Sequence, residues 1–285
     1  MRLLIFGLGF CGTATARAAL EAGWTVSVTT RNIATAAPAG VQLVAFRAAG
    51  DAIASATHTL ATAPPRDGTG DPVLTRYAAE IAAAPLMWLG YLSTTGVYGD
   101  RGGGWVDEAT VPAPTADRGH RRLGAEMAWR AAAAGRPLDI FRLAGIYGPG
   151  RSIFEDLATH RARRVIKPGH TFGRIHVDDI AHGVLAAIAR PPQGARVLNF
   201  CDDEPAESAE VTAYAAGLAG VPVPQAVPFD EAWAGMGEMA RSFWAESRRV
   251  ANAQTKSVLR LAWRYPTYRE GLAAILAKQR DDQPG

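Results

Sequence analysis

The chain opens on the segment Leu3-Leu4-Ile5-Phe6-Gly7-Leu8-Gly9-Phe10-Cys11-Gly12, an apolar run that leads into a glycine-rich turn and a helix-forming stretch. A strand, a tight turn and a helix start in this order form a pocket for a diphosphate. Gly7 permits the turn, Gly9 lets the backbone approach the phosphates, and Gly12 lets the helix pack on the strand. The helix amides and dipole then attract the anion. We therefore predict that Gly7, Gly9, Phe10, Cys11 and Gly12 bind a dinucleotide cofactor.

The end of the second predicted strand bears on which dinucleotide is bound. A helix over Thr13–Ala22 is followed by the apolar strand Thr25–Thr29 and then by Thr30-Arg31-Asn32. Folds that prefer NAD usually have an acidic residue here for the ribose hydroxyls, and this chain has none. The Arg31 guanidinium can instead pair with a 2′-phosphate through two hydrogen bonds. We predict NADP(H), with NAD possible and with a merely solvated Arg31 as the alternative.

Composition and charge exclude several classes of protein. Lys and Arg outnumber Asp and Glu by only 30 to 27 in 285 residues, which does not indicate a surface built for nucleic acid. The two cysteines, Cys11 and Cys201, do not form a disulfide scaffold and fit a reducing compartment. No apolar run approaches the roughly 20 residues needed to span a membrane, and a strand begins at once where a signal peptide would lie. We expect a cytoplasmic protein without membrane or nucleic-acid partners.

Short apolar runs alternate with helical patterns along most of the chain. Further strands are predicted at Val41–Phe46, Thr57–Ala61, Leu86–Leu92, Leu138–Arg142 and Arg196–Phe200. Further helices are predicted at Asp71–Ala84, Asp117–Ala134 (with Asp117 as N-cap) and Asp178–Arg190. This alternation predicts an α/β fold, a Rossmann-type doubly wound parallel sheet with a smaller, mostly helical C-terminal lobe.

The predicted boundaries divide the chain into two parts. Residues 1–148 and 170–204 are assigned to the Rossmann dinucleotide-binding domain, and residues 149–169 and 205–285 to the smaller substrate-side lobe. The edge where the strands end is where doubly wound folds bind ligands. Ala63 and Pro64, which follow the strand Thr57–Ala61 after Thr62, are also assigned to the predicted cofactor site.

Several local sequences in a fixed order carry a family resemblance. They are Ser93-Thr94-Thr95-Gly96-Val97-Tyr98-Gly99, Arg142-Leu143-Ala144-Gly145-Ile146-Tyr147-Gly148-Pro149-Gly150, Arg174-Ile175-His176-Val177-Asp178-Asp179-Ile180-Ala181 and Leu198-Asn199-Phe200-Cys201-Asp202. Together with the N-terminal glycines they resemble the extended short-chain dehydrogenase/reductase superfamily, the NAD-dependent epimerase/dehydratase family. The resemblance covers residues 1 to about 205 and continues weakly to Tyr265-Pro266-Thr267-Tyr268 and beyond.

The resemblance implies catalytic residues, and one of them is missing. Thr94 matches the hydroxyl residue that binds the reacting oxygen, although it could instead satisfy backbone groups at the strand end. The family's Tyr-x-x-x-Lys, in which the phenol transfers the proton, aligns with Arg118 and Arg122. Arg122 could still bind a cofactor ribose, whereas a guanidinium such as that of Arg118 keeps its proton and cannot replace the phenol. The chain therefore resembles the atypical members that lack the tyrosine.

No other residue replaces the tyrosine convincingly. His120 points away from the Arg118 face of a regular helix, Tyr98 and Tyr147 belong to loop motifs, and His176 fits a motif that ties the sheet to the smaller lobe. Basic residues gather where the chain first leaves the predicted sheet, within residues 149–169, and they either border the substrate or form a solvated face. They are Arg151, Arg161, Arg163, Arg164 and Lys167. No cluster of residues has metal-ligand spacing, so no metal site is predicted.

Two functions fit these features. The first is an NADP(H)-dependent oxidoreductase or epimerase that acts on a small-molecule substrate, a nucleoside diphosphate sugar or a similar alcohol or carbonyl. In this enzyme Thr94 would orient the oxygen, and water or an unidentified group would move the proton. The second is a catalytically degenerate NADP(H)-binding sensor or regulatory protein, which the Arg118 substitution favours. The hydroxyl triplet and Arg122 favour the enzyme, and a homodimer is possible in either case.

Overall fold

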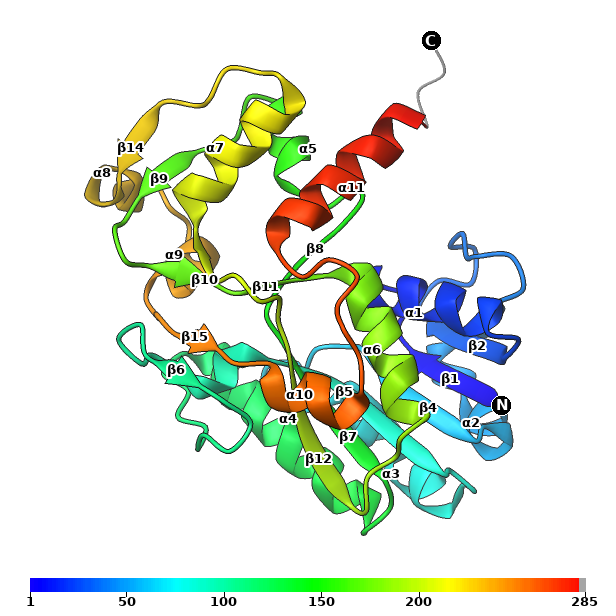
Figure 1. Ribbon diagram of the computed structural model, residues 1–285. Helices are drawn as coiled ribbons and strands as arrows, with labels where there is room; N and C mark the ends of the chain where they lie inside the picture. Colours follow the sequence, from blue (N-terminus) through cyan, green and yellow to red (C-terminus); the bar gives the residue numbers. More distant parts are fainter. Residues whose placement is uncertain (282–285) are drawn as a thin grey trace.

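The central element of the protein is a parallel sheet. The computed structural model describes residues 1–281, and its main sheet has seven strands in the order β12-β7-β5-β4-β1-β2-β3 (Figure 1). Every pairing in this sheet is parallel. The strands are β1 (Arg2–Phe6), β2 (Thr25–Thr30), β3 (Gln42–Ala45), β4 (His58–Ala61), β5 (Trp88–Thr94), β7 (Leu138–Leu143) and β12 (Ala195–Phe200).

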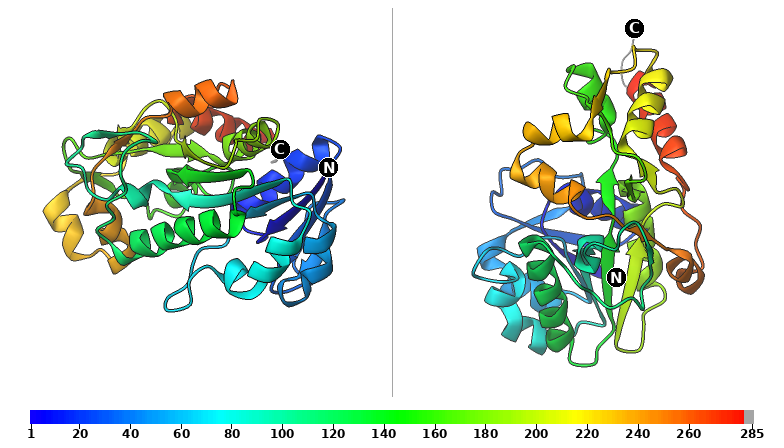
Figure 2. Two further views of the ribbon diagram at one scale, coloured as in Figure 1. Left: turned by 90° about the horizontal axis from the view of Figure 1, so that it is seen from below. Right: turned by 90° about the vertical axis from the view of Figure 1, so that its left-hand side faces the viewer.

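Helices cover both faces of the sheet and enclose two hydrophobic cores. One face carries α1 (Phe10–Glu21), α6 (Val177–Ile188) and α10 (Ala253–Leu259). The other carries α2 (Gly50–Ser55), α3 (Pro72–Ala83) and α4 (Asp117–Ala133). Figure 2 shows the sheet between these two layers. The strands β4 and β2 lie on either side of β1, so the chain winds outward in both directions, which confirms the predicted doubly wound Rossmann-type fold.

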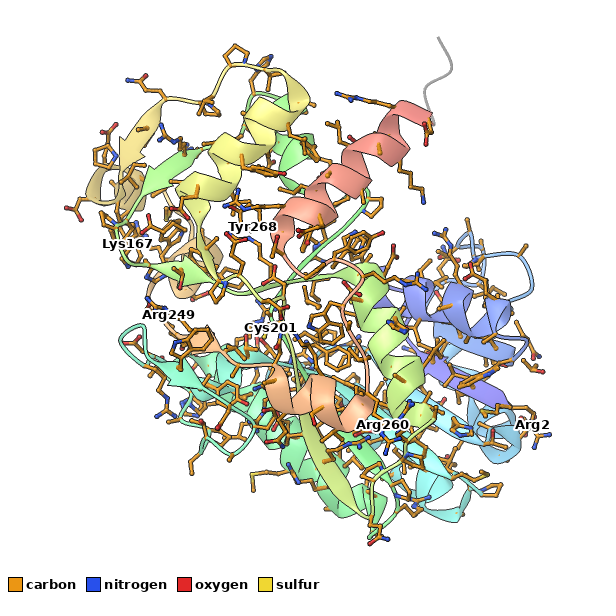
Figure 3. The ribbon with its side chains drawn as sticks, in the orientation of Figure 1. Arg2, Lys167, Cys201, Arg249, Arg260 and Tyr268 are labelled. Carbon is orange, nitrogen blue, oxygen red and sulfur yellow. The ribbon has the colours of Figure 1, made fainter. Side chains whose placement is uncertain are left out.

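The smaller lobe stands over the edge where the sheet strands end. Its core contains Tyr147, Phe154, Tyr268, Leu272 and Ile275. Its elements are α5 (Ile153–Ala158), β9 (Arg164–Ile166), β10 (Thr171–Phe172), β13 (Ala206–Glu207), α7 (Ser208–Ala219), β14 (Ala226–Pro228), α8 (Phe229–Ala234), α9 (Glu238–Trp244) and α11 (Tyr268–Asp281). The short parallel strands β8 (Gly145–Tyr147) and β11 (Arg174–His176) lead from the sheet into this lobe. In Figure 3, Cys201 lies where the lobe meets the sheet and Tyr268 lies at the start of α11.

The predicted strands and helices agree with the main sheet and the helices around it. The short strands were not predicted. Strands of two or three residues, such as β6 (Trp105–Val106) and β15 (Arg249–Val250), are too short to produce a periodic pattern. The N-cap prediction was wrong by one residue: α4 is capped by Ala116, and Asp117 is its first helical residue. An acidic residue in the first turn still interacts favourably with the helix dipole.

The division into two domains stays a prediction. In the described residues no helix is long and apolar enough to cross a membrane.

A buried ion pair fixes α4 on the sheet. The Glu126 carboxylate of α4 accepts hydrogen bonds from Arg142 Nε at 3.1 Å and Nη2 at 2.8 Å, and Arg142 belongs to β7. The Ser93 hydroxyl of β5 donates to the same carboxylate at 2.6 Å. One turn further along α4, Trp129 Nε1 donates to Asp71, which also accepts from two amides at the start of α3. Side-chain hydrogen bonds therefore join α4 to two sheet strands and to α3.

Removing one partner of this ion pair should destabilise the protein strongly. In Glu126→Gln, the buried Arg142 guanidinium loses its counter-charge, and we expect the free energy of unfolding to fall by about 3–5 kcal/mol. Urea unfolding followed by circular dichroism measures the loss. The double variant Glu126→Gln/Arg142→Met should recover part of it, because no uncompensated charge remains. A double variant as unstable as the sum of the two single variants would contradict this account.

Candidate functional site

A cavity of about 660 Å³ lies at the edge where the parallel strands end, beneath the smaller lobe. It extends from the glycine turn, past the ends of β5 and β7 and the first turns of α4, to β8, β10 and β11. The C-terminal part of the chain contributes one wall through α9 and the start of β15. Because parallel strands all end at this edge, residues far apart in sequence meet here.

The glycine turn has the geometry that the sequence predicts for a diphosphate site. Gly7 has a positive φ of +117°, and a Cβ on Gly12 would lie 2.1 Å from the Gly7 carbonyl oxygen, so both positions require glycine. A Cβ on Gly9 would meet nothing within 4 Å, so this backbone faces open space. No side chain caps the N-terminus of α1, and its first turn holds no acidic residue. The turn is open to an anion.

The residues predicted for the cofactor do not all line the cavity. Gly9, Phe10, Cys11 and Gly12 line it, and Gly7 supports the turn from behind. Burial raises the pKa of the Cys11 thiol to about 11, so Cys11 is an uncharged thiol at neutral pH. Beyond β4, Thr62 lines the cavity where Ala63 and Pro64 were predicted to do so. The Thr62 hydroxyl lies 3.0 Å from the Phe6 carbonyl oxygen and 3.2 Å from the Gly7 carbonyl oxygen, to either of which it can donate, and so it braces the turn. The sequence search missed Thr62 because it considered the Ala-Pro step after the strand.

Arg31 lies apart from the cavity. It directly follows β2, and its side chain is exposed. In the described chain no carboxylate lies within ion-pair distance of it. Arg31 follows β2, the strand that pairs with β1. In this fold the residue at that place contacts the adenosine ribose of the cofactor.

The three hydroxyl residues at the end of β5, Ser93, Thr94 and Thr95, have different environments. Ser93 is buried and donates to Glu126, so its hydroxyl is committed to the ion pair. Thr94 is partly exposed, lines the cavity, and its Oγ1 accepts a hydrogen bond from the Gly96 amide at 3.1 Å. The Thr94 hydroxyl proton is therefore left to donate to a bound molecule. Thr95 also lines the cavity and is buried.

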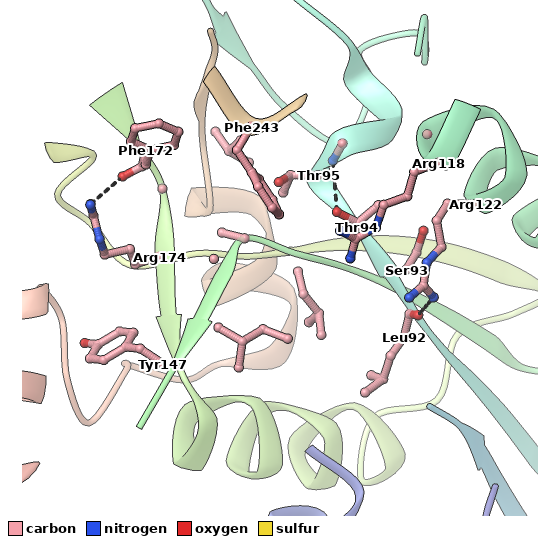
Figure 4. A pocket seen from close by; sticks show the side chains of 18 of the residues that line it. Leu92, Ser93, Thr94, Thr95, Arg118, Arg122, Tyr147, Phe172, Arg174 and Phe243 are labelled. Carbon is pink, nitrogen blue, oxygen red and sulfur yellow. Dashed lines mark hydrogen bonds between the residues drawn. The ribbon is translucent and has the colours of Figure 1, made fainter. Parts of the chain in front are cut away.

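Arg118 and Arg122 both line the cavity from the same face of α4 (Figure 4). Arg122 is buried, and its Nη1 donates to the Tyr91 hydroxyl at 3.1 Å and to the Leu92 carbonyl at 2.8 Å. Its other N–H groups remain available for a ligand. Arg118 is exposed, and its guanidinium lies 5.7 Å from the centre of the Phe243 ring of α9. Burial lowers the pKa of Arg118, and the charges of Arg122, Arg121 and Arg151 lower it further.

No described tyrosine of the site is prepared to give up its proton at neutral pH. Burial raises the pKa of Tyr91 to about 12, and it also raises the pKa values of Tyr98 and Tyr147. Tyr98 donates to Asn199 at 2.8 Å in the core. His176 is the N-cap of α6 and packs on Tyr265 with a ring separation of 4.2 Å, which agrees with a structural role between sheet and lobe.

Several cavity residues were missed by the sequence analysis because they come from late parts of the chain. Phe243 and Trp244 end α9, Glu246 and Arg248 lie between α9 and β15, and none of the four belongs to a motif. Arg248 donates to Glu246 at 2.6 Å and to the Gly99 carbonyl at 2.8 Å, which places it beside the hydroxyl triplet. Of the five basic residues at the first excursion from the sheet, Arg151 lines the cavity, and Lys167 instead donates to the Trp244 carbonyl at 2.7 Å.

A second chamber of about 430 Å³ adjoins the first inside the smaller lobe. Arg151, Arg174 and Tyr147 line both chambers. Behind Arg174 lies Asp202, whose two carboxylate oxygens are buried and accept no hydrogen bond within the described residues. Burial raises the pKa of Asp202 to about 8, although the nearby Arg174 charge lowers it. Burial therefore favours the uncharged form of the Asp202 carboxyl.

Comparisons with known proteins place the chain among characterised folds. No protein-family model matches the sequence. The protein YeeZ of Escherichia coli strain K12 is 30% identical over 243 residues, which cover 79% of this chain and 86% of that protein. The structure of a functionally unknown conserved protein from Silicibacter pomeroyi DSS is 45% identical, with a TM-score of 0.88 over 98% of this chain and 99% of that one.

Solved enzymes share the fold at lower identity. The UDP-glucuronic acid 4-epimerase from Bacillus cereus, solved in complex with NAD, has a TM-score of 0.76 at 16% identity and covers 99% of both chains. The chain therefore belongs to the same family as YeeZ, and it shares its fold with the NAD-bound epimerase, whose dinucleotide turn and ordered motifs its own sequence resembles. The names of YeeZ and of the Silicibacter protein state no activity.

The buried Asp202 carboxyl should make stability depend on pH. Its folded-state pKa of about 8 lies above the ordinary value near 4, so the folded protein holds a proton that the unfolded chain releases between these pH values. This contribution to the free energy of unfolding is present at low pH and is lost as pH rises towards 8. We expect Asp202→Asn to reduce the fall between pH 5 and pH 8 by on the order of 2 kcal/mol, measured by urea unfolding. An unchanged pH slope in the variant would contradict this role.

Proposed function

We propose that the protein binds NADP(H) and is an oxidoreductase or epimerase that acts on a sugar nucleotide or a similar alcohol or carbonyl substrate. One observation carries this proposal: a single cavity connects the open glycine turn to the free hydroxyl proton of Thr94. A dinucleotide bound at the turn would extend towards the place where Thr94 can hold the oxygen of a substrate. The family resemblance of the motifs and the fold shared with NAD-bound epimerases support the same assignment.

The site fits a dinucleotide by its own geometry. The backbone at Gly9 is open, the N-terminus of α1 has no side-chain cap, and Arg151 lies 5.6 Å from the centre of the Phe10 ring beside the turn. These groups would hold the diphosphate, while Arg122 would donate to a ribose from the first turns of α4. Arg31 and the absence of an acidic residue after β2 support NADP(H). The chemistry that a nicotinamide supplies when it is bound is hydride transfer.

The residues around Thr94 would orient the substrate rather than exchange its proton. The Gly96 amide fixes the Thr94 oxygen, so its hydroxyl can donate to a substrate oxygen in one direction. Arg118 keeps its proton, and the tyrosines nearby have raised pKa values. In this proposal, water that enters past the exposed Arg118 carries the proton. The adjoining second chamber, with Arg151 and Arg174 at its junction, supports a substrate as long as a sugar nucleotide.

Arg118 also favours a second candidate, a catalytically degenerate sensor of NADP(H). In such a sensor the cofactor site is intact, but the neighbouring position 118 cannot transfer a proton. This arrangement would suit a protein that changes its conformation when NADP(H) binds. Calorimetric titration with NADPH and NADH, followed by product analysis on a panel of sugar nucleotides, separates the two functions. Product formation supports the enzyme, including a redox-neutral epimerase that leaves the nicotinamide absorbance unchanged. Tight NADPH binding without any product supports the sensor.

The cofactor assignment predicts the effect of reversing one charge. In Arg31→Glu, a carboxylate faces the 2′-phosphate, and we expect the affinity for NADPH to fall by about tenfold or more while NADH binding is kept. Calorimetry measures both affinities. Arg190→Glu makes the same charge change beyond the C-terminus of α6, on the far edge of the sheet, and serves as the control. Equal NADPH affinity in the parent and in Arg31→Glu would show that Arg31 is only a solvated residue.

The assignment of Thr94 predicts a loss of turnover without a loss of cofactor. Thr94→Ala removes the donor to the substrate oxygen, and we expect turnover to fall by roughly 100- to 1,000-fold with NADPH affinity within about threefold of the parent. Thr94→Ser keeps the hydroxyl and should retain most of the activity. Unchanged turnover in Thr94→Ala would remove Thr94 from the site.

A further inference from the structure

The cavity carries an excess of positive charge. Its described lining includes five arginines, Arg118, Arg122, Arg151, Arg174 and Arg248, and one carboxylate, Glu246. Glu246 is already paired with Arg248 at 2.6 Å. Within residues 1–281, the remaining four arginines have no carboxylate at ion-pair distance. Like charges that gather without a counter-charge are unfavourable, so bound anions would complete this site.

Three of these four arginines have another partner in the protein or in the proposed cofactor. Arg151 lies against Phe10 at the glycine turn, where the diphosphate would bind. Arg122 is held by Tyr91 and Leu92 near the proposed ribose position. Arg174 donates to the carbonyls of Phe172 and Ala206 and lines the second chamber. A dinucleotide diphosphate would therefore neutralise Arg151, and the Arg122 and Arg174 guanidiniums have neutral acceptors. Arg118 instead lies against the Phe243 ring, which accepts no hydrogen bond of this kind and supplies no counter-ion.

Arg118 is placed to meet the reacting end of a substrate. It lies one helical turn before Arg122, on the cavity side that also holds Thr94 (Figure 4). The Phe243 ring packs over its guanidinium, which supports the charge on one side without supplying an acceptor for its N–H groups. The guanidinium fork matches a planar carboxylate with two parallel hydrogen bonds.

We propose that the substrate carries a carboxylate at its reacting end and that Arg118 binds this carboxylate. The inference rests on the proposed function and names the class of substrate, an acidic sugar nucleotide. Arg118 is then a specificity-determining residue, in a position where the family's tyrosine would have transferred a proton. The Thr94 hydroxyl and the Arg118 guanidinium together would fix the oxygen and the carboxylate of one sugar ring.

A matched pair of ligands tests this proposal on the cofactor-loaded protein. UDP-glucuronic acid and UDP-glucose differ only in a carboxylate against a hydroxymethyl group on the sugar ring. Calorimetry should show that the parent binds the acidic ligand about tenfold or more tightly, and that Arg118→Met reduces the preference to within about twofold. Arg121→Met is the control, because Arg121 neighbours Arg118 but pairs with Asp67 and does not line the cavity. NADPH affinity should be the same in all three proteins.

Each other outcome has a definite meaning. Equal binding of the two ligands by the parent, or a preference that survives in Arg118→Met, overturns the proposal. A loss of NADPH affinity in Arg118→Met also overturns it, because Arg118 would then belong to the cofactor. If neither sugar nucleotide binds, the sugar-nucleotide part of the proposed function fails, and malonate becomes the probe of the arginine alone. Saturable malonate binding that Arg118→Met abolishes supports a carboxylate site, and equal behaviour of the two proteins overturns it.

Discussion

The buried ion pair between Glu126 and Arg142 is the constraint on which the site depends. A carboxylate removed from water is tolerated only where donors surround it, and Glu126 has three hydrogen bonds, from Arg142 and Ser93. These donors lie on β7 and β5, so α4 can occupy only one rotation and height over the sheet. Residues four apart share a helical face, and Glu126 therefore fixes where Arg122 and Arg118 point. The helix that presents cations to the cavity is oriented by its own buried anion.

Much of the fold and the centre of the site could be predicted from local sequence. A strand, a turn and a helix that follow each other directly leave their pattern in consecutive residues, and the glycine turn is such a unit. Gly7 and Gly12 meet backbone or side-chain atoms too closely for a Cβ, which is why the residue type itself indicates the geometry. Thr94 ends a buried strand, and parallel strands end at one edge, so its presence near the turn follows from topology.

The remainder of the site depends on tertiary contacts that no local pattern records. Arg248 and Phe243 reach the cavity from a segment more than 100 residues beyond β5, through short helices and a two-residue strand. Asp202 ends one of the sequence motifs, but the motif does not indicate that its carboxyl is buried, and burial is what makes its charge unfavourable. Serine at position 93 could equally have faced a substrate, and its bond to Glu126 is decided by where α4 packs. Burial and pairing arise from the folded chain as a whole.

Arg118, where the family resemblance predicts a tyrosine, places a cation at the wall of the cavity. A phenol beside a cation can release a proton, and a guanidinium among cations can only attract an anion. The surrounding protein is consistent with the second role: the neighbouring charges are arginines, the carboxylate of the wall is already paired, and burial favours the uncharged form of Asp202. A cavity with these properties retains anions by electrostatic attraction. Selectivity among substrates would then come from where their negative charges lie relative to Arg118, Arg151 and Arg174, rather than from proton transfer at its walls.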